Sequence, residues 1–151
     1  MENEKLAAIA AELAPGAVIV EGNQFIEITV APDQLVTVAA NLKQNNETAF
    51  DMLVSITGMD WGQELGTTYH FRSTSFNHMI VIKTRISDRD NPEIDSLCHL
   101  WPAADFHERE VYDLLGIKFR GHPDLRRLFL DSTWGYPLRK DYKDEINIVT
   151  K

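Results

Sequence analysis

Hydrophobic residues along the chain switch irregularly between the helical repeat and the strand repeat, and this pattern restricts the possible folds most strongly. Apolar residues share one helical face in segments 6–13, 35–42 and 94–101, and a further helix is predicted from Pro102 to Gly116. Apolar runs bounded by turn residues predict strands at 18–20, 25–30, 52–61, 67–73 and 79–86. Because these elements do not alternate regularly, we expect an α+β two-layer sandwich, with helices packed on a mixed sheet of about five strands.

Regular periodicity fades after Gly116, and the remaining residues contain several prolines, glycines and paired charges. A segment of this kind rarely packs well by itself. We therefore predict two parts, an α+β domain of residues 1–116 and an extended C-terminal arm of residues 117–151 that docks on a partner subunit. Trp134 and Tyr136 are expected to anchor the C-terminal arm on that partner, because aromatic residues are enriched as interface anchors. Before assembly we expect the arm to be mobile.

The charges are distributed unevenly along the chain. Residues 1–64 contain ten acidic residues and two lysines, whereas residues 65–151 contain thirteen acidic and thirteen basic residues. The first part has the composition of an acidic, solvated surface, and the second has charges that can pair with each other or with a partner. No basic patch exceeds its acidic neighbours, so the sequence predicts no nucleic-acid ligand.

Patterns for cofactor binding are incomplete. Cys98 is the single cysteine, whereas iron–sulfur clusters need about four, so we interpret it as a core thiol. The helical zinc motif would require a second histidine at the position of Val111. Gly116 and Gly121 have the spacing of a phosphate loop, but Pro123 removes a backbone donor where that loop needs one. We therefore predict no cofactor-binding, metal or catalytic site in this chain.

Glu108 and Glu110 could suggest a catalytic carboxylate pair. Residues two apart on a helix do not face each other, so the two carboxylates cannot act on one substrate bond. We expect each of them to pair with a different cation. One remote alternative stays open, a free-standing metal-dependent enzyme that uses His107 together with Glu108 and Glu110.

The segment from Asp105 to Tyr142 holds five of the eight arginines and two of the five histidines, interleaved with acids, which indicates a fixed network of ion pairs. Its pattern closely resembles the signature of the 30-kDa subunit family of respiratory complex I, the proton-pumping NADH:quinone oxidoreductase. The residues that carry this resemblance are Glu108, Arg109, Glu110, Asp113, Leu114, Leu115, His122, Arg126 and Leu128, followed by the run Pro-Leu-Arg-Lys-Asp at 137–141.

The resemblance implies a non-catalytic structural and assembly subunit in the peripheral arm of the complex. A protein of this family has no cofactor of its own and packs on the 49-kDa subunit near the quinone-reducing region, with an iron–sulfur subunit as a neighbour. The complex itself would use FMN, iron–sulfur clusters, NADH and quinone. It would lie on the cytoplasmic face of the cell inner membrane, and this chain would reach the membrane only through the complex.

Related subunits occur in energy-converting hydrogenases and in ferredoxin-fed complexes, and these remain alternatives. In each case the resemblance implies that one set of residues locks the last helix to the C-terminal arm and the arm to the partner. This structural and interface set is Glu108, Arg109, Glu110, Asp113, His122, Arg126, Arg127, Arg139 and Lys140.

Overall fold

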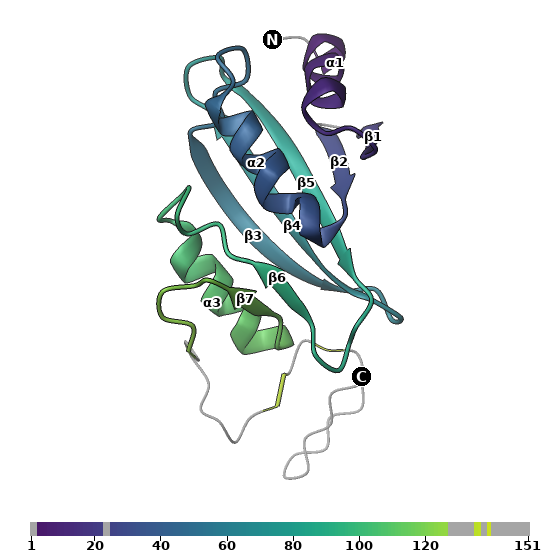
Figure 1. Ribbon diagram of the computed structural model, residues 1–151, viewed down its shortest axis with the longest axis vertical. Coiled ribbons are helices and arrows are strands. Elements are labelled where there is room, and N and C mark those ends of the chain that lie inside the picture. Colours follow the sequence, from purple (N-terminus) through teal and green to yellow (C-terminus); the bar gives the residue numbers. More distant parts are fainter. Residues whose placement is uncertain (1–2, 23–24, 127–134, 137–138, 140–151) are drawn as a thin grey trace.

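The computed structural model describes residues 3–22, 25–126, 135, 136 and 139 (Figure 1). Its helices are α1 (Asn3–Leu13), the 3₁₀ turn η1 (Pro32–Gln34), α2 (Leu35–Gln44) and α3 (Ala104–Leu115). Its strands are β1 (Val18–Glu21), β2 (Ile26–Val30), β3 (Met52–Asp60), β4 (Leu65–Ser73), β5 (His78–Ile86), β6 (Glu93–Asp95) and β7 (Lys118–Arg120). The strands and helices predicted from the periodicity are therefore present, with one exception given below.

Five strands form one sheet in the order β1-β2-β5-β4-β3. The pairing of β2 with β5 is parallel and the other three pairings are antiparallel, so the sheet is mixed. Helices α1 and α2 lie against one face of it (Figure 1). The alternation in β2 explains this arrangement, because Ile26, Ile28 and Val30 are buried while Glu27 and Thr29 are only half-buried. The predicted α+β two-layer sandwich is confirmed.

Helix α3 packs on the edge strand β3 at Gly58. A Cβ atom at Gly58 would lie 2.3 Å from Cδ1 of Leu115 and 3.0 Å from Cγ1 of Val111. Gly58 follows the buried Ile56 by two residues, so α3 covers the same sheet face as the other helices. The missing side chain at Gly58 allows the helix to approach the strand closely.

The segment 94–101 was expected to be helical, and this expectation is wrong. Ile94 instead lies in the short strand β6, where it pairs in parallel with Phe119 of β7, and both side chains are buried. Turns follow up to Trp101. A single buried residue between two half-buried acids satisfies the strand repeat as well as the helical one, and an eight-residue window cannot separate the two.

Strand β7 lies beyond Gly116, the last residue assigned to the α+β domain from the sequence. Ile117 and Phe119 are buried in the core of that domain. Core packing therefore continues past Gly116, at least to Phe119, and the exact boundary between the α+β domain and the C-terminal arm stays a prediction. Most of the arm lies outside the described residues, so its docking on a partner stays a prediction.

Replacing Gly58 by phenylalanine is expected to lower the free energy of unfolding by about 2 kcal/mol, because the ring has no room between β3 and α3. Gly58→Ala requires Cδ1 of Leu115 to move and Cγ1 of Val111 to yield slightly, so its expected loss is smaller, below ~1 kcal/mol. Urea unfolding of both variants measures the difference. Equal stability of the two would show that α3 does not pack tightly at Gly58.

Candidate functional site

The signature residues lie on and around α3, a helix whose buried stripe contains a carboxylate. Ala104, Glu108, Val111 and Leu115 are buried at helical spacing on this stripe. The helix follows Pro102 and ends at Gly116, which adopts the left-handed conformation with φ 78°. Because Glu108 shares the stripe with apolar residues, its side chain points into the protein and not into solvent.

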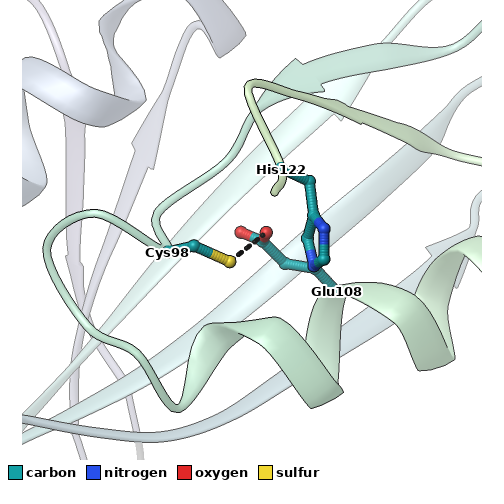
Figure 2. A group of neighbouring side chains, drawn as sticks. All are labelled: Cys98, Glu108 and His122. Carbon is teal, nitrogen blue, oxygen red and sulfur yellow. Dashed lines mark hydrogen bonds between the residues drawn. The ribbon is translucent and has the colours of Figure 1, made fainter. Parts of the chain in front are cut away.

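The Glu108 carboxylate is fully buried and accepts three hydrogen bonds from the turn before α3. The Ser96 hydroxyl donates to Oε1 at 2.6 Å, and the Leu97 amide donates to Oε2 at 2.8 Å. The Cys98 thiol also donates to Oε1, at 3.2 Å, and Figure 2 shows this thiol pointing at the carboxylate. A buried carboxylate needs such donors to offset its lost hydration. Glu108 thus ties α3 to the 96–98 turn.

Burial also determines the protonation of this group. Loss of solvent raises the pKa of Glu108 above its ordinary value, although the Ser96 and Leu97 donors oppose the shift. Burial raises the pKa of Cys98 to about 12, and the neighbouring carboxylate adds to the effect. The thiol is therefore protonated at neutral pH and is not activated as a nucleophile.

Cys98, Glu108 and His122 could hold a metal ion on the basis of residue type, because their ligand atoms lie within 4.8 Å of one another. The hydrogen bonds of His122 do not fit this use. Its Nδ1 accepts from the Asp124 amide at 2.9 Å, and its Nε2 lies 3.2 Å from the Asp105 carbonyl oxygen. Both ring nitrogens are thus engaged, so a metal would have to displace one of these contacts. The cluster is better explained as a hydrogen-bonded junction between α3, the 96–98 turn and the segment after β7.

His122 and Arg109 meet at Asp105, near the start of α3. His122 Nε2 lies 3.1 Å from Asp105 Oδ1, and its side chain is fully buried. Because Nδ1 accepts a hydrogen bond, Nε2 carries the proton, and it donates to the Asp105 carbonyl oxygen while lying close to the carboxylate. Arg109 is 3.7 Å from the same carboxylate oxygen one helical turn away. Asp105 therefore joins two signature residues, although the sequence analysis did not place it in the site.

The other signature residues are distributed around this junction. Asp113 is fully buried on α3, while Glu110 is half-buried and lines a small hollow of ≈80 Å³ between α3 and β3. Arg126 has a side chain that is 68% exposed and forms an ion pair with the exposed Asp124, at 3.2 Å. The expected interface residues Arg127, Trp134 and Lys140 lie outside the described residues. The interface roles of this set stay predictions.

Two residues of the C-terminal arm contact the end of α3. The Tyr136 ring lies over Gly116, where an added Cβ would come within 2.7 Å of it, and the Tyr112 ring is 6.3 Å away. Arg139 Nε donates to the Leu115 carbonyl at 2.6 Å, and its guanidinium lies 5.1 Å from the Tyr136 ring centre. A helix end leaves such carbonyls unpaired and favours a cation beside them.

The helical spacing pairs Asp105 with Arg109, and the structure contains that contact. The sequence analysis missed Ser96 and Leu97 as partners of Glu108, and Asp105 as a partner of His122. Ser96 and Asp105 have ordinary residue types for turns and helix starts, and Leu97 contributes only its backbone amide. Helical spacing and the density of acids around Asp105 are visible in the sequence, but they do not say which acid meets His122. These contacts depend on how three segments fold together.

A second hollow, of ≈590 Å³, is bordered by Phe25 and Trp61 and contains the ion pair of Glu27 and Lys83. It lies on the sheet face opposite the helices, since Glu27 alternates with the buried residues of β2. Among the described residues, no member of the signature lines it. This hollow is therefore separate from the α3 junction.

The chain that contains the α3 junction is similar to known proteins in sequence and in overall structure. The sequence profile described as respiratory-chain NADH dehydrogenase, 30 Kd subunit, matches residues 28–146. The C subunit of the NADH-quinone oxidoreductase of Moorella thermoacetica is 38% identical over 134 residues, which cover 87% of this chain and 88% of that protein. The corresponding protein of Roseiflexus castenholzii is 40% identical over 120 residues, covering 77% of this chain and 68% of that protein.

Some relatives are longer. The C/D subunit of the NADH-quinone oxidoreductase of Phocaeicola vulgatus is 52% identical over 108 residues, covering 70% of this chain but 21% of that protein. This chain thus corresponds to about a fifth to a quarter of the length of the relatives named as C/D subunits.

Among solved structures, a chain of the archaeal membrane-bound sulfane sulfur reductase, a respiratory membrane complex, has a TM-score of 0.81 and 27% identity. The match covers 95% of this chain and 86% of that chain. With the profile match over residues 28–146, these findings show that the chain belongs to the 30-kDa subunit family of respiratory-chain NADH dehydrogenase.

Proposed function

We propose that this chain is a non-catalytic structural subunit of the peripheral arm of a proton-translocating NADH:quinone oxidoreductase. In this proposal it packs on the 49-kDa-type subunit near the quinone-reducing region, and an iron–sulfur subunit is its neighbour. The FMN, the iron–sulfur clusters and the binding sites for NADH and quinone would then belong to other subunits of the complex.

The observation that carries this proposal is that the Glu108 carboxylate is buried and hydrogen-bonded within the chain. Glu108 and Asp113 are the two fully buried acids of the signature. The three hydrogen-bond donors to Glu108 come from the chain itself. Reactive groups in catalytic sites need access to a substrate, and Glu108 has no exposed surface. Such an arrangement supports a role in holding the fold, so the exposed signature residues are left to make contacts with a partner.

The names of the longer relatives support the choice of partner. In Phocaeicola vulgatus and Bacteroides thetaiotaomicron, the C/D subunit is one polypeptide, and this chain matches about a quarter of it or less. Two parts fused in one chain are held at high effective concentration. We therefore propose a protein of the D type, the 49-kDa subunit, as the direct partner.

A second candidate is an equivalent position in a different membrane-bound respiratory complex, such as an energy-converting hydrogenase or a ferredoxin-fed complex. It is favoured by the likeness to a chain of the sulfane sulfur reductase complex. Affinity purification of the native protein from gently solubilised membranes, followed by mass spectrometry, discriminates the two. Recovery of an NADH-oxidising flavoprotein together with the chain supports the first candidate, and recovery of a nickel-site subunit supports the second. Recovery of the chain alone contradicts both.

The proposed position is at the membrane, on its cytoplasmic face, through the other subunits. In the part of the chain that the structure describes, no helix has the length and apolar content needed to cross a bilayer. Membrane association would then depend on the complex. Release of the chain from membranes together with the 49-kDa-type subunit is the result that this proposal expects.

Replacing Arg126 by alanine is expected to lower the NADH:quinone reductase activity of membranes at least about tenfold, because the arginine loses its contact with the partner. The side chain is 68% exposed in the free chain, so the stability of that chain should change by no more than about 0.5 kcal/mol. The measurements are quinone reduction, the amount of assembled complex on native gels, and urea unfolding of the free chain.

Arg120→Ala is the matched control, because Arg120 is also exposed, at 53%, and also pairs with one aspartate. It lies outside the signature, and we expect normal assembly from it. If Arg126→Ala assembles and reduces quinone as the control does, Arg126 is not an interface residue.

A further inference from the structure

The contact between the C-terminal arm and α3 joins residues that are far apart in the sequence. Tyr136 and Arg139 meet Gly116 and Leu115 at the C-terminal end of the helix, and the Arg139 amide donates to the Tyr136 carbonyl at 3.1 Å. The four residues form what we call the arm clamp. On α3, the clamp consists of Gly116, which has no side chain, and the Leu115 carbonyl. On the arm, it consists of the Tyr136 ring and the Arg139 guanidinium beside that ring.

Each part of the arm clamp has a physical requirement that the other part meets. Gly116 must take a positive φ of 78° to end α3, and its missing Cβ leaves the space that the Tyr136 ring fills. The Leu115 carbonyl is one of the unpaired acceptors at a helix C-terminus, and a guanidinium is a suitable donor for it. Stacking on Tyr136 restricts the rotamers of Arg139, so the donor is held in place.

We infer that the arm clamp positions the C-terminal arm for its partner subunit before assembly, in place of the mobile arm expected from the sequence. This inference rests on the proposed function and adds Tyr136, Gly116 and Leu115 to it as positioning residues, with Arg139 acting inside its own chain. A segment fixed at one point loses less conformational entropy on binding than a free one, so preorganisation strengthens the complex. The clamp also ties the arm to the helix that carries Glu108.

The first experiment uses the full chain and its purified 49-kDa-type partner. Amide hydrogen exchange of the free chain should show the Arg139 amide protected, and Tyr136→Ala should increase its exchange rate about tenfold. The same variant should raise the dissociation constant for the partner about tenfold. The amides of β4 and β5 should keep their protection from exchange.

The second experiment separates the clamp from the backbone effect of the glycine. Gly116→Ala and Gly62→Ala both place a side chain at a positive φ, 78° and 95°, but only the first meets Tyr136. We expect Gly116→Ala to weaken partner binding about tenfold more than Gly62→Ala. In the Tyr136→Ala background, this excess should disappear because the ring is gone.

The outcomes separate this inference from the proposed function. An unprotected Arg139 amide in the unaltered free chain overturns the inference, even if the partner binds. Faster exchange in Tyr136→Ala with an unchanged dissociation constant also overturns it, because the clamp would then exist without positioning the arm. Absence of any partner binding by the unaltered chain refutes the proposed function, while the exchange data still report on the clamp.

Discussion

Trp101→Ala is expected to lower the free energy of unfolding by about 4 kcal/mol, the largest loss among the changes considered. The Trp101 side chain is buried, and its ring lies 4.7 Å from that of Phe71 in β4. Its Nε1 donates to the Phe50 carbonyl at 3.2 Å, and Lys43 of α2 lies over the ring at 5.3 Å. Removal leaves a cavity and an unpaired carbonyl where the helix layer, the sheet and the turn before α3 meet.

Trp61→Ala is the matched control, because it makes the same chemical change at a tryptophan that is 37% exposed. Trp61 lies beside Gly66 and stacks with Arg85, and we expect its removal to cost about 1–2 kcal/mol. Denaturant unfolding of both variants gives the comparison. Similar losses for the two would mean that Trp101 does not link the layers as the structure indicates.

Glu108→Ala is expected to lower the free energy of unfolding by about 3 kcal/mol, because the Ser96, Leu97 and Cys98 donors would lose their acceptor inside the protein. The turn before α3 should loosen first, since these donors are what hold it to the helix. Urea unfolding measures the loss, and exchange of the Leu97 amide should accelerate in parallel. A loss below about 1 kcal/mol would show that water replaces the carboxylate.

Glu108→Gln keeps the shape and one acceptor oxygen, and it isolates the effect of protonation. Burial raises the pKa of Glu108 above its ordinary value of 4.5, so the folded chain keeps a proton that the unfolded chain releases. Stability from this group is therefore fully present below pH 4.5 and is lost as the pH rises through the raised pKa. The stability of the unaltered chain minus that of Glu108→Gln should fall with rising pH across this window. A rise instead would mean that the three donors outweigh burial.

The sequence was sufficient to predict the strands of the five-stranded sheet and to identify the family. Ile26, Ile28 and Val30 alternate with polar residues, which requires a strand with one buried face, and Gly116 is where a helix can end. The signature from Glu108 to Arg126 identifies the family, and the profile match confirms it. These features are local, so they can be read from spacing alone.

The sequence was not sufficient for Ile94, which was placed in a helix and lies in a strand. Its strand exists only because Phe119, far along the chain, supplies the parallel partner. Periodicity reports that a side chain is buried on one face, but it does not report which segment covers that face. A strand of three residues has too little sequence to show its own repeat.

The contact partners of the signature residues could not be predicted from the sequence for the same reason. The amide of Leu97 binds Glu108, and every residue except proline has such an amide, so no residue type marks the contact. Tyr136 meets Gly116 because the chain returns to the end of α3, which no local pattern predicts. The sequence by itself determined the elements, the fold class and the family, because spacing and residue type encode them. Only the tertiary structure decided that the buried Glu108 joins α3 to the 96–98 turn and that Arg139 caps the end of α3, because those roles depend on contacts between distant segments.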